Sequence, residues 1–107
     1  MKDLARMHCK ALEGHAAMSA DEIAAHLKDA EGWFLNDGAI EKTFRFADYH
    51  QTMAFVNAVA WIAHREDHHP DMAVGYNRCT LRFNTHSVEG VSLNDFICAA
   101  RVDAFSA

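Results

Sequence analysis

The sequence predicts an α+β fold, in which helices pack on one face of a four-stranded antiparallel sheet in the order α-β-β-α-β-β-α. Segments near residues 39–47 and 78–86 alternate between apolar and polar side chains, so their strands have one apolar face to bury. Three other segments carry apolar residues at helical spacing. The 107 residues fit one domain, which we assign to residues 19–107, preceded by an irregular lead-in over residues 1–18.

The first helix is predicted to begin at Ser19, because Glu22 three residues later completes a capping box and Asp21 suits the positive end of a helix. Gly32 is expected to end the helical segment. The residues at helical spacing form a narrow apolar stripe, namely Ile23, Ala24, Leu27 and Ala30.

A hairpin is expected next, because the pair Asp37-Gly38 is a strong turn signal. The turn predicts that residues 33–36 and 39–47 pair antiparallel. In the second of these segments Ile40, Phe44 and Phe46 share one face.

The central helix begins after Asp48, a candidate N-cap, and runs for about twenty residues without Gly or Pro. It must end before Pro70, the only proline in the chain. A second hairpin with a turn at residues 75–78 should follow, and it places His86 at the end of the last strand on the polar face. Ser92 then caps a last helix, whose apolar stripe is Leu93, Phe96, Ile97, Ala100 and Ala104.

Composition excludes several classes of function. The net charge is −5 and no cluster of Lys and Arg exists, which argues against direct nucleic-acid binding. No apolar run approaches the roughly 18 residues needed to span a bilayer, and the N-terminus lacks the apolar core of a signal peptide. We therefore expect a cytoplasmic protein with no membrane contact. The cysteines Cys9, Cys79 and Cys98 are odd in number and far apart, as reduced thiols would be.

The stretch "HREDHHPDM", residues 64–72, gathers three histidines and three acids around the proline, and three interpretations of it are open. His64 and His68 share a helix face at zinc-ligand spacing, but Arg65 stands where a zinc protease needs Glu. The histidines would also suit the negative end of an ordinary charged helix. The third interpretation is acid–base catalysis by His68 and His69, two imidazoles held by the proline at a helix end.

Two residues further along extend the catalytic interpretation, and each has an ordinary alternative. His86 could supply a third imidazole, or could be an exposed strand-end residue. Asp95 could orient a histidine, or could simply complete the capping box that Ser92 begins.

Three motifs in this order resemble the pterin-4a-carbinolamine dehydratases: "DHHP", "YNRCTLRFNTH" and "GVSLND". Upstream, "GW" and "FRFADYHQTMAFVNAVA" are similar to the family's second strand and long helix, so the likeness covers residues 19–104. One departure is His64, at a position where the family often has glutamate.

The resemblance implies a dehydratase that removes water from 4a-hydroxytetrahydrobiopterin to give quinonoid dihydrobiopterin, without a metal or an organic cofactor. It implies that His68, His69 and His86 form a histidine trio, with His68 and His69 as acid and base. Asp95 would orient a histidine, and Trp33 would stack on the pterin unless it is an ordinary core aromatic. The other residues implied in substrate binding are Pro70, Thr85, Ser87 and Val88.

The same resemblance implies partners. The protein is expected to be a homodimer or homotetramer and to serve an aromatic amino-acid hydroxylase by recycling tetrahydrobiopterin. The alternative is a non-catalytic dimeric interaction module or transcriptional coactivator on the same fold. A pure binding module has no need of three imidazoles and an acid at these positions, and this favours the enzyme.

Overall fold

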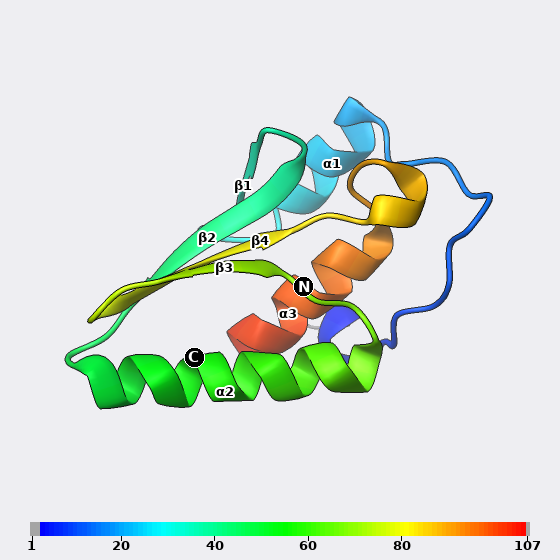
Figure 1. The fold of residues 1–107 in the computed structure, drawn as a ribbon. Coiled ribbons are helices and arrows are strands. Elements are labelled where there is room, and N and C mark those ends of the chain that lie inside the picture. The colour runs from blue at the N-terminus through cyan, green and yellow to red at the C-terminus, as the bar shows by residue number, and fades with distance from the viewer. Residues whose placement is uncertain (1–2, 107) are drawn as a thin grey trace.

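The computed structural model describes residues 3–106 of the chain. Four strands form one antiparallel sheet in the order β1-β2-β4-β3, and α2 and α3 run along one side of it (Figure 1). This confirms the predicted fold class and the order of helices and strands, to which the structure adds two short 3₁₀ helices, η1 and η2. The elements in chain order are η1 Leu4–Arg6, α1 Ala20–Leu27, β1 Phe34–Asn36, β2 Ala39–Arg45, α2 Tyr49–Glu66, β3 Asp71–Val74, β4 Arg78–Phe83, η2 His86–Val88 and α3 Leu93–Ser106.

The centre of the sheet is the pair β2 and β4, in which alternate residues face the helices. The register opposes Ile40 to Phe83 and Phe44 to Cys79, and all four of these side chains are buried. The predicted turn between β1 and β2 is confirmed: Asp37 and Gly38 both have positive φ, as the tight hairpin turn requires.

The edge of the sheet and the surface differ from this centre. Met72 and Val74 of β3 pair with buried residues of β4, yet they are 39% and 45% exposed because β3 is an edge strand.

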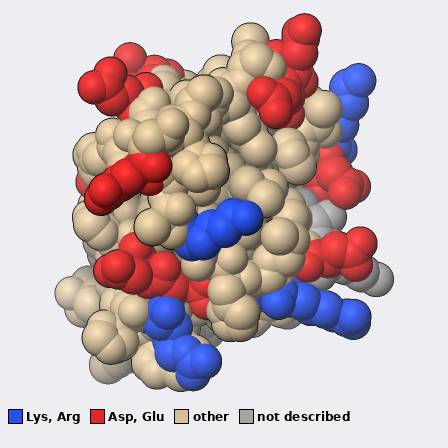
Figure 2. Space-filling model, turned by 90° about the vertical axis from the view of Figure 1, so that its right-hand side faces the viewer, with Lys and Arg blue, Asp and Glu red and all other residues tan. Residues whose placement is uncertain are grey.

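Seen from the right of Figure 1, acidic and basic side chains are scattered, and this face has no continuous basic patch (Figure 2). None of the helices within residues 3–106 combines the length and the apolar composition needed to cross a bilayer.

The predicted helix starts at Ser19 and Asp48 are confirmed. Ser19 Oγ accepts from the Glu22 N–H at 3.1 Å, and the Glu22 carboxylate accepts from the Ser19 N–H at 3.0 Å, which completes the capping box. Asp48 Oδ1 accepts from the Gln51 N–H at 2.8 Å.

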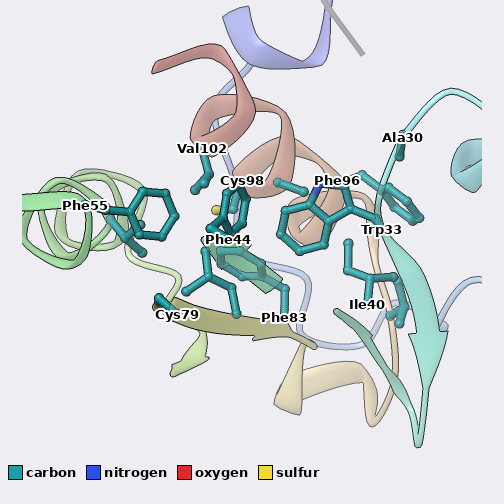
Figure 3. Close-up of a cluster of buried hydrophobic side chains, with 14 of the residues drawn as sticks. Ala30, Trp33, Ile40, Phe44, Phe55, Cys79, Phe83, Phe96, Cys98 and Val102 are labelled. Atoms are coloured by element: carbon teal, nitrogen blue, oxygen red, sulfur yellow. The ribbon is translucent and has the colours of Figure 1, made fainter. Parts of the chain in front are cut away.

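Helix α3 is buried on more sides than the predicted stripe. Every residue from 94 to 100 is buried, and so is Val102. The reason is that α3 packs against β4, α2 and η1 together, so no broad face remains for solvent. Phe96, Cys98 and Val102 of this helix lie among the core side chains in Figure 3.

Candidate active site

The site begins where α2 ends. Asp67 adopts a left-handed conformation with φ 50°, and the His68 N–H donates to the Ala63 carbonyl at 3.1 Å. This hydrogen bond, from the residue after the left-handed one back across the last turn, is a Schellman-type helix end. Pro70 is buried two residues later and cannot continue a helix. The chain therefore leaves α2 in a defined direction, and this brings the His68 side chain within reach of Asp95 on α3.

The imidazole of His68 is held from two sides. Its Nε2 lies 2.6 Å from Oδ1 of Asp95, and its ring stacks on Phe83 with a centroid distance of 6.1 Å and an interplanar angle of 13°. Asp95 is fully buried, and the side chain of His68 is 12% exposed. His68 thus comes from the end of α2 and Asp95 from the first turn of α3, and the two make the contact with a histidine that was expected of Asp95.

The second oxygen of Asp95 is also fully engaged. Its Oδ2 accepts from Thr85 Oγ1 and from the Ser92 N–H, each at 2.9 Å. The hydroxyls of Thr85 and Ser92 are 2.6 Å apart, and Ser92 Oγ accepts from the Asn94 N–H at 3.2 Å. One donor order satisfies all these contacts: Asn94 to Ser92, Ser92 to Thr85, and Thr85 to Asp95. Asp95 therefore makes the acid's half of the expected capping box, by accepting from the Ser92 N–H, and it also contacts a histidine. The other half differs, because Ser92 Oγ accepts from the Asn94 N–H and not from the Asp95 N–H.

These hydrogen bonds define which nitrogen of His68 can act as a base. An ionised carboxylate only accepts hydrogen bonds, so the contact with Asp95 requires the proton on Nε2. In the neutral ring Nδ1 then carries the free lone pair. The Asp95 carboxylate lies at the start of α3 and has three hydrogen-bond partners, so it holds the His68 ring in one orientation.

His69 and His86 are placed differently. Both residues are exposed, and within residues 3–106 neither imidazole makes a hydrogen bond. His86 was expected at the end of the last strand, and this expectation is wrong: β4 ends at Phe83, and His86 begins η2. The cause is the exchange of backbone hydrogen bonds between Thr85 and Gly90, at 2.7 and 3.3 Å, which closes a tight loop in place of further pairing.

A cavity of about 280 Å³ lies beside this network. Of the predicted site residues, His68, Thr85 and Ser87 line it. The volume is near the lower end of the range for small-molecule sites. A hollow of about 860 Å³ elsewhere is larger, but the predicted site residues are absent from its lining, which includes Lys42 and Asp103.

Trp33 lies in the core. It is 5% exposed, its Nε1 donates to Asp103 Oδ2 at 2.9 Å, and its ring contacts those of Phe44 and Phe83. This placement favours the core-aromatic alternative over stacking on a pterin, because almost no ring surface faces solvent.

The remaining wall of the cavity was not predicted. It consists of residues 9–12, part of an N-terminal segment that we define as residues 7–12, together with Glu66, Asp67 and Asn94. The buried Glu66 carboxylate accepts from the Cys9 N–H at 2.7 Å and contacts His8 Nδ1 at 2.9 Å. Burial opposes ionisation of Glu66, but these contacts and the charge of Arg101 outweigh it, and the pKa of Glu66 lies below its usual range. The one sequence signal for this wall is that Asn94 directly precedes the candidate site residue Asp95.

Metal ligation was one of the three interpretations of residues 64–72. Within residues 3–106, no group of three or more His, Cys, Asp or Glu side chains is arranged to hold a metal ion. His64 lies exposed in the last turn of α2.

A sequence model of the family described as pterin 4 alpha carbinolamine dehydratase matches residues 16–105. The chain belongs to this family. Among its relatives, a protein of Nitrosospira multiformis is 53% identical over 94% of the chain and 90% of that protein, and one of Nitrosomonas eutropha is 56% identical over 94% and 91%. Both relatives are named "Putative pterin-4-alpha-carbinolamine dehydratase".

Two solved structures extend the family comparison. A protein of Brucella melitensis described as a transcriptional coactivator/pterin dehydratase superposes with a TM-score of 0.82 and 30% identity, over 85% of this chain and 99% of that one. A pterin dehydratase-like protein described as a RuBisCO assembly factor in the alpha-carboxysome has a TM-score of 0.59 and 25% identity, over 70% and 87%. The family fold therefore occurs in proteins described as enzymes and in one described as an assembly factor.

Proposed function

We propose that the protein is a 4a-hydroxytetrahydrobiopterin dehydratase that eliminates water by histidine acid–base catalysis. The observation that supports this most directly is the buried Asp95–His68 pair beside a small cavity, in a chain of the pterin carbinolamine dehydratase family. Such a pair has the parts of a general base: a free ring nitrogen and a fixed counter-charge.

The proposed reaction moves two protons. The hydroxyl on the 4a carbon leaves with one added proton as water, and the adjacent ring nitrogen loses one proton, so the products are quinonoid dihydrobiopterin and water. We assign proton removal to Nδ1 of His68, because Asp95 stabilises the resulting imidazolium. His69 is the proposed acid, and His86 the proposed pterin contact. Both rings are exposed and thus free to approach a ligand.

Substrate binding is proposed along residues 85–88. Thr85 and Ser87 line the cavity, and the backbone exchange between Thr85 and Gly90 holds this loop rigid. Val88 and Pro70 are assigned supporting roles, Val88 in this loop and Pro70 at the end of α2.

The decisive experiment supplies 4a-hydroxytetrahydrobiopterin to the purified protein and follows the quinonoid product by absorbance. We expect turnover well above the rate in buffer, and a loss of about 10²–10⁴-fold in His69→Ala. His50→Ala is the matched control, because His50 is also exposed but lies in the first turn of α2, at the opposite end of that helix. A wild-type rate equal to that of buffer would rule out the dehydratase.

We further propose that the protein acts in recycling tetrahydrobiopterin for an aromatic amino-acid hydroxylase and assembles as a homodimer or homotetramer. Support for assembly comes from exposed apolar side chains, including Met72 and Val74 on the edge strand and Trp61 on α2. Light scattering on the purified chain checks the assembly. A coupled assay, in which the protein accelerates a phenylalanine hydroxylase limited by its pterin cofactor, checks the pathway.

A second candidate, a non-catalytic interaction module, is favoured by the descriptions of the two solved relatives as a coactivator and as an assembly factor. The two candidates differ in their need for imidazoles. If a partner is captured equally well by a variant lacking His68, His69 and His86, and wild-type turnover is absent, the interaction module is the better account.

A further inference from the structure

Two cysteines from opposite ends of the chain touch each other. Sγ of Cys9 lies 3.5 Å from Sγ of Cys98, although 89 residues separate them in sequence. Cys98 is fully buried in α3, whereas Cys9 is partly exposed. The third cysteine, Cys79, is buried on β4 and has no such neighbour within the described residues.

The contact is held by hydrogen bonds on both sides of Cys9. Before it, the guanidinium of Arg101 donates to the Met7 carbonyl at 2.9 Å. At Cys9 itself the N–H donates to Glu66. After it, the Lys10 N–H donates to Asn94 Oδ1 at 3.2 Å, and Asn94 Nδ2 donates to the Lys10 carbonyl at 2.8 Å. The N-terminal segment is therefore fixed against α2 and α3, and the two sulfur atoms meet without any covalent bond.

We propose that Cys9 and Cys98 are an oxidation-sensitive thiol pair that closes to a disulfide when the protein meets hydrogen peroxide. The sulfur atoms need to approach only from 3.5 Å to about 2.05 Å, the length of a disulfide bond. Cys79 is excluded from the pair by its separate position on the sheet.

The chemistry balances in two steps. Peroxide first oxidises the accessible Cys9 thiol to a sulfenic acid and is itself reduced to water. The sulfur of Cys98 then attacks Sγ of Cys9: the S–S bond forms, the S–O bond breaks, and the departing hydroxide takes the thiol proton of Cys98 as a second water. In sum, two thiols and one peroxide give one disulfide and two waters.

The division of roles follows from the surroundings of each sulfur. The contact with Cys9, burial, and the charges of Asp95 and Glu66 raise the pKa of Cys98, so it remains a thiol and reacts second. Cys9 is the thiol that peroxide can reach.

The disulfide would also act on the cavity. Residues 9–12 form one wall of it beside His68, and a bond from Cys9 to α3 would link that wall covalently to α3 until the bond is reduced. Any change in turnover that follows from this link rests on the proposed dehydratase activity, whereas formation of the disulfide does not.

Tryptic mapping tests the proposal directly, because cleavage after Lys and Arg places the three cysteines in three different peptides: residues 7–10, 79–82 and 83–101. The full chain is treated with hydrogen peroxide and then unfolded in urea, so that its remaining thiols, buried ones included, are alkylated; the digest is analysed by mass spectrometry without reduction. We expect peptide 7–10 linked to peptide 83–101, lighter than the sum of the two by two hydrogens and separated by a reductant. Cys79 should stay reduced through the peroxide step and be found alkylated.

Variants make the result decisive. Cys79→Ser should still form the link, and Cys98→Ser should leave Cys9 as a sulfenic acid that dimedone traps. The oxidised wild-type protein should melt at least about 5 °C above the reduced protein, because the bond closes a long loop. Links that involve Cys79, or equal cross-linking in the folded and the urea-unfolded chain, would overturn the proposal. So would full alkylation of Cys9 and Cys98 after peroxide. None of these outcomes depends on whether the protein dehydrates a pterin.

Discussion

The histidines of the candidate site fall into two regions with opposite physical properties. His68 is almost buried, stacked on Phe83 and bonded to Asp95. His69 and His86 are exposed, and their rings make no hydrogen bond within residues 3–106. The buried ring has its orientation and tautomer fixed before any ligand arrives, whereas the exposed rings can adjust to one. A site of this kind should therefore lose activity in different ways when each region is altered.

The largest effect is expected for Asp95→Asn. The Thr85 hydroxyl and the Ser92 N–H both donate to Oδ2, so the amide oxygen of Asn would take that position and its NH₂ would face His68. Nε2 would then have to accept, the proton would move to Nδ1, and the base would be lost. We expect kcat for pterin dehydration to fall by roughly 10³–10⁴-fold.

Asp103→Asn is the matched control for this variant, because Asp103 lies on the same helix and accepts from Trp33 and Lys42 far from His68. It should lower the melting temperature and leave kcat within about twofold of the wild-type value. Equal losses of kcat in the two variants would mean that Asp95 acts only on stability.

His86→Ala tests the exposed region. His86 is the proposed pterin contact, so its loss should raise KM and lower kcat, and we expect kcat/KM to fall by about 10–100-fold. The free energy of unfolding should change by less than about 0.5 kcal/mol, because the side chain is exposed. Steady-state kinetics and urea unfolding on the same preparation measure both. A large loss of stability with unchanged kcat/KM would contradict the assignment.

Local signals in the sequence explain why much of this arrangement could be predicted. Pro70 sets where α2 must end, and the spacing of Ser92 and Asp95 sets where α3 begins. Each of these signals acts within one turn of the chain. In the same way, the alternation over residues 39–47 and 78–86 predicted the two central strands, which the structure pairs over Ala39–Arg45 and Arg78–Phe83.

The unpredicted parts depend on contacts between distant segments. The N-terminal segment is held by hydrogen bonds between residues that are 57 to 94 positions apart. The sequence of this segment has no helical or strand periodicity from which these contacts could be predicted. The position of His86 was misjudged because alternation continued beyond Phe83, while the backbone pairing of Thr85 with Gly90 ended the strand. In both cases contacts that the local sequence pattern does not reveal determined the structure, and these contacts override that pattern.

Thr85→Val tests the buried hydrogen-bond network around Asp95. Valine keeps the shape of threonine but removes the hydroxyl that links Ser92 to Asp95, so two buried polar groups each lose a partner. We expect the free energy of unfolding to fall by about 1–3 kcal/mol. Thr80→Val is the control, because within residues 3–106 the Thr80 hydroxyl bonds only to Thr43, on the exposed face of the sheet, at 2.8 Å. This substitution should lower the free energy of unfolding by less than about 0.5 kcal/mol. Equal costs in urea unfolding would refute the buried network as the cause.

The smallest effect is expected for Glu66→Gln, which loosens the N-terminal segment at the rim of the buried region. Partners hold the pKa of Glu66 below its ordinary value of 4.5, so its charge stabilises the folded state above that pH. This contribution is lost as the pH falls through the lowered pKa.

At neutral pH the variant should be less stable by about 1 kcal/mol, because the Cys9 N–H and His8 then face a neutral amide. The difference from wild type should shrink as urea unfolding is repeated at decreasing pH below about 4.5, whereas exposed Glu13→Gln should show little difference at any pH. A difference that stays constant across this range would mean that Glu66 acts through packing alone, and that its charge does not hold the segment in place.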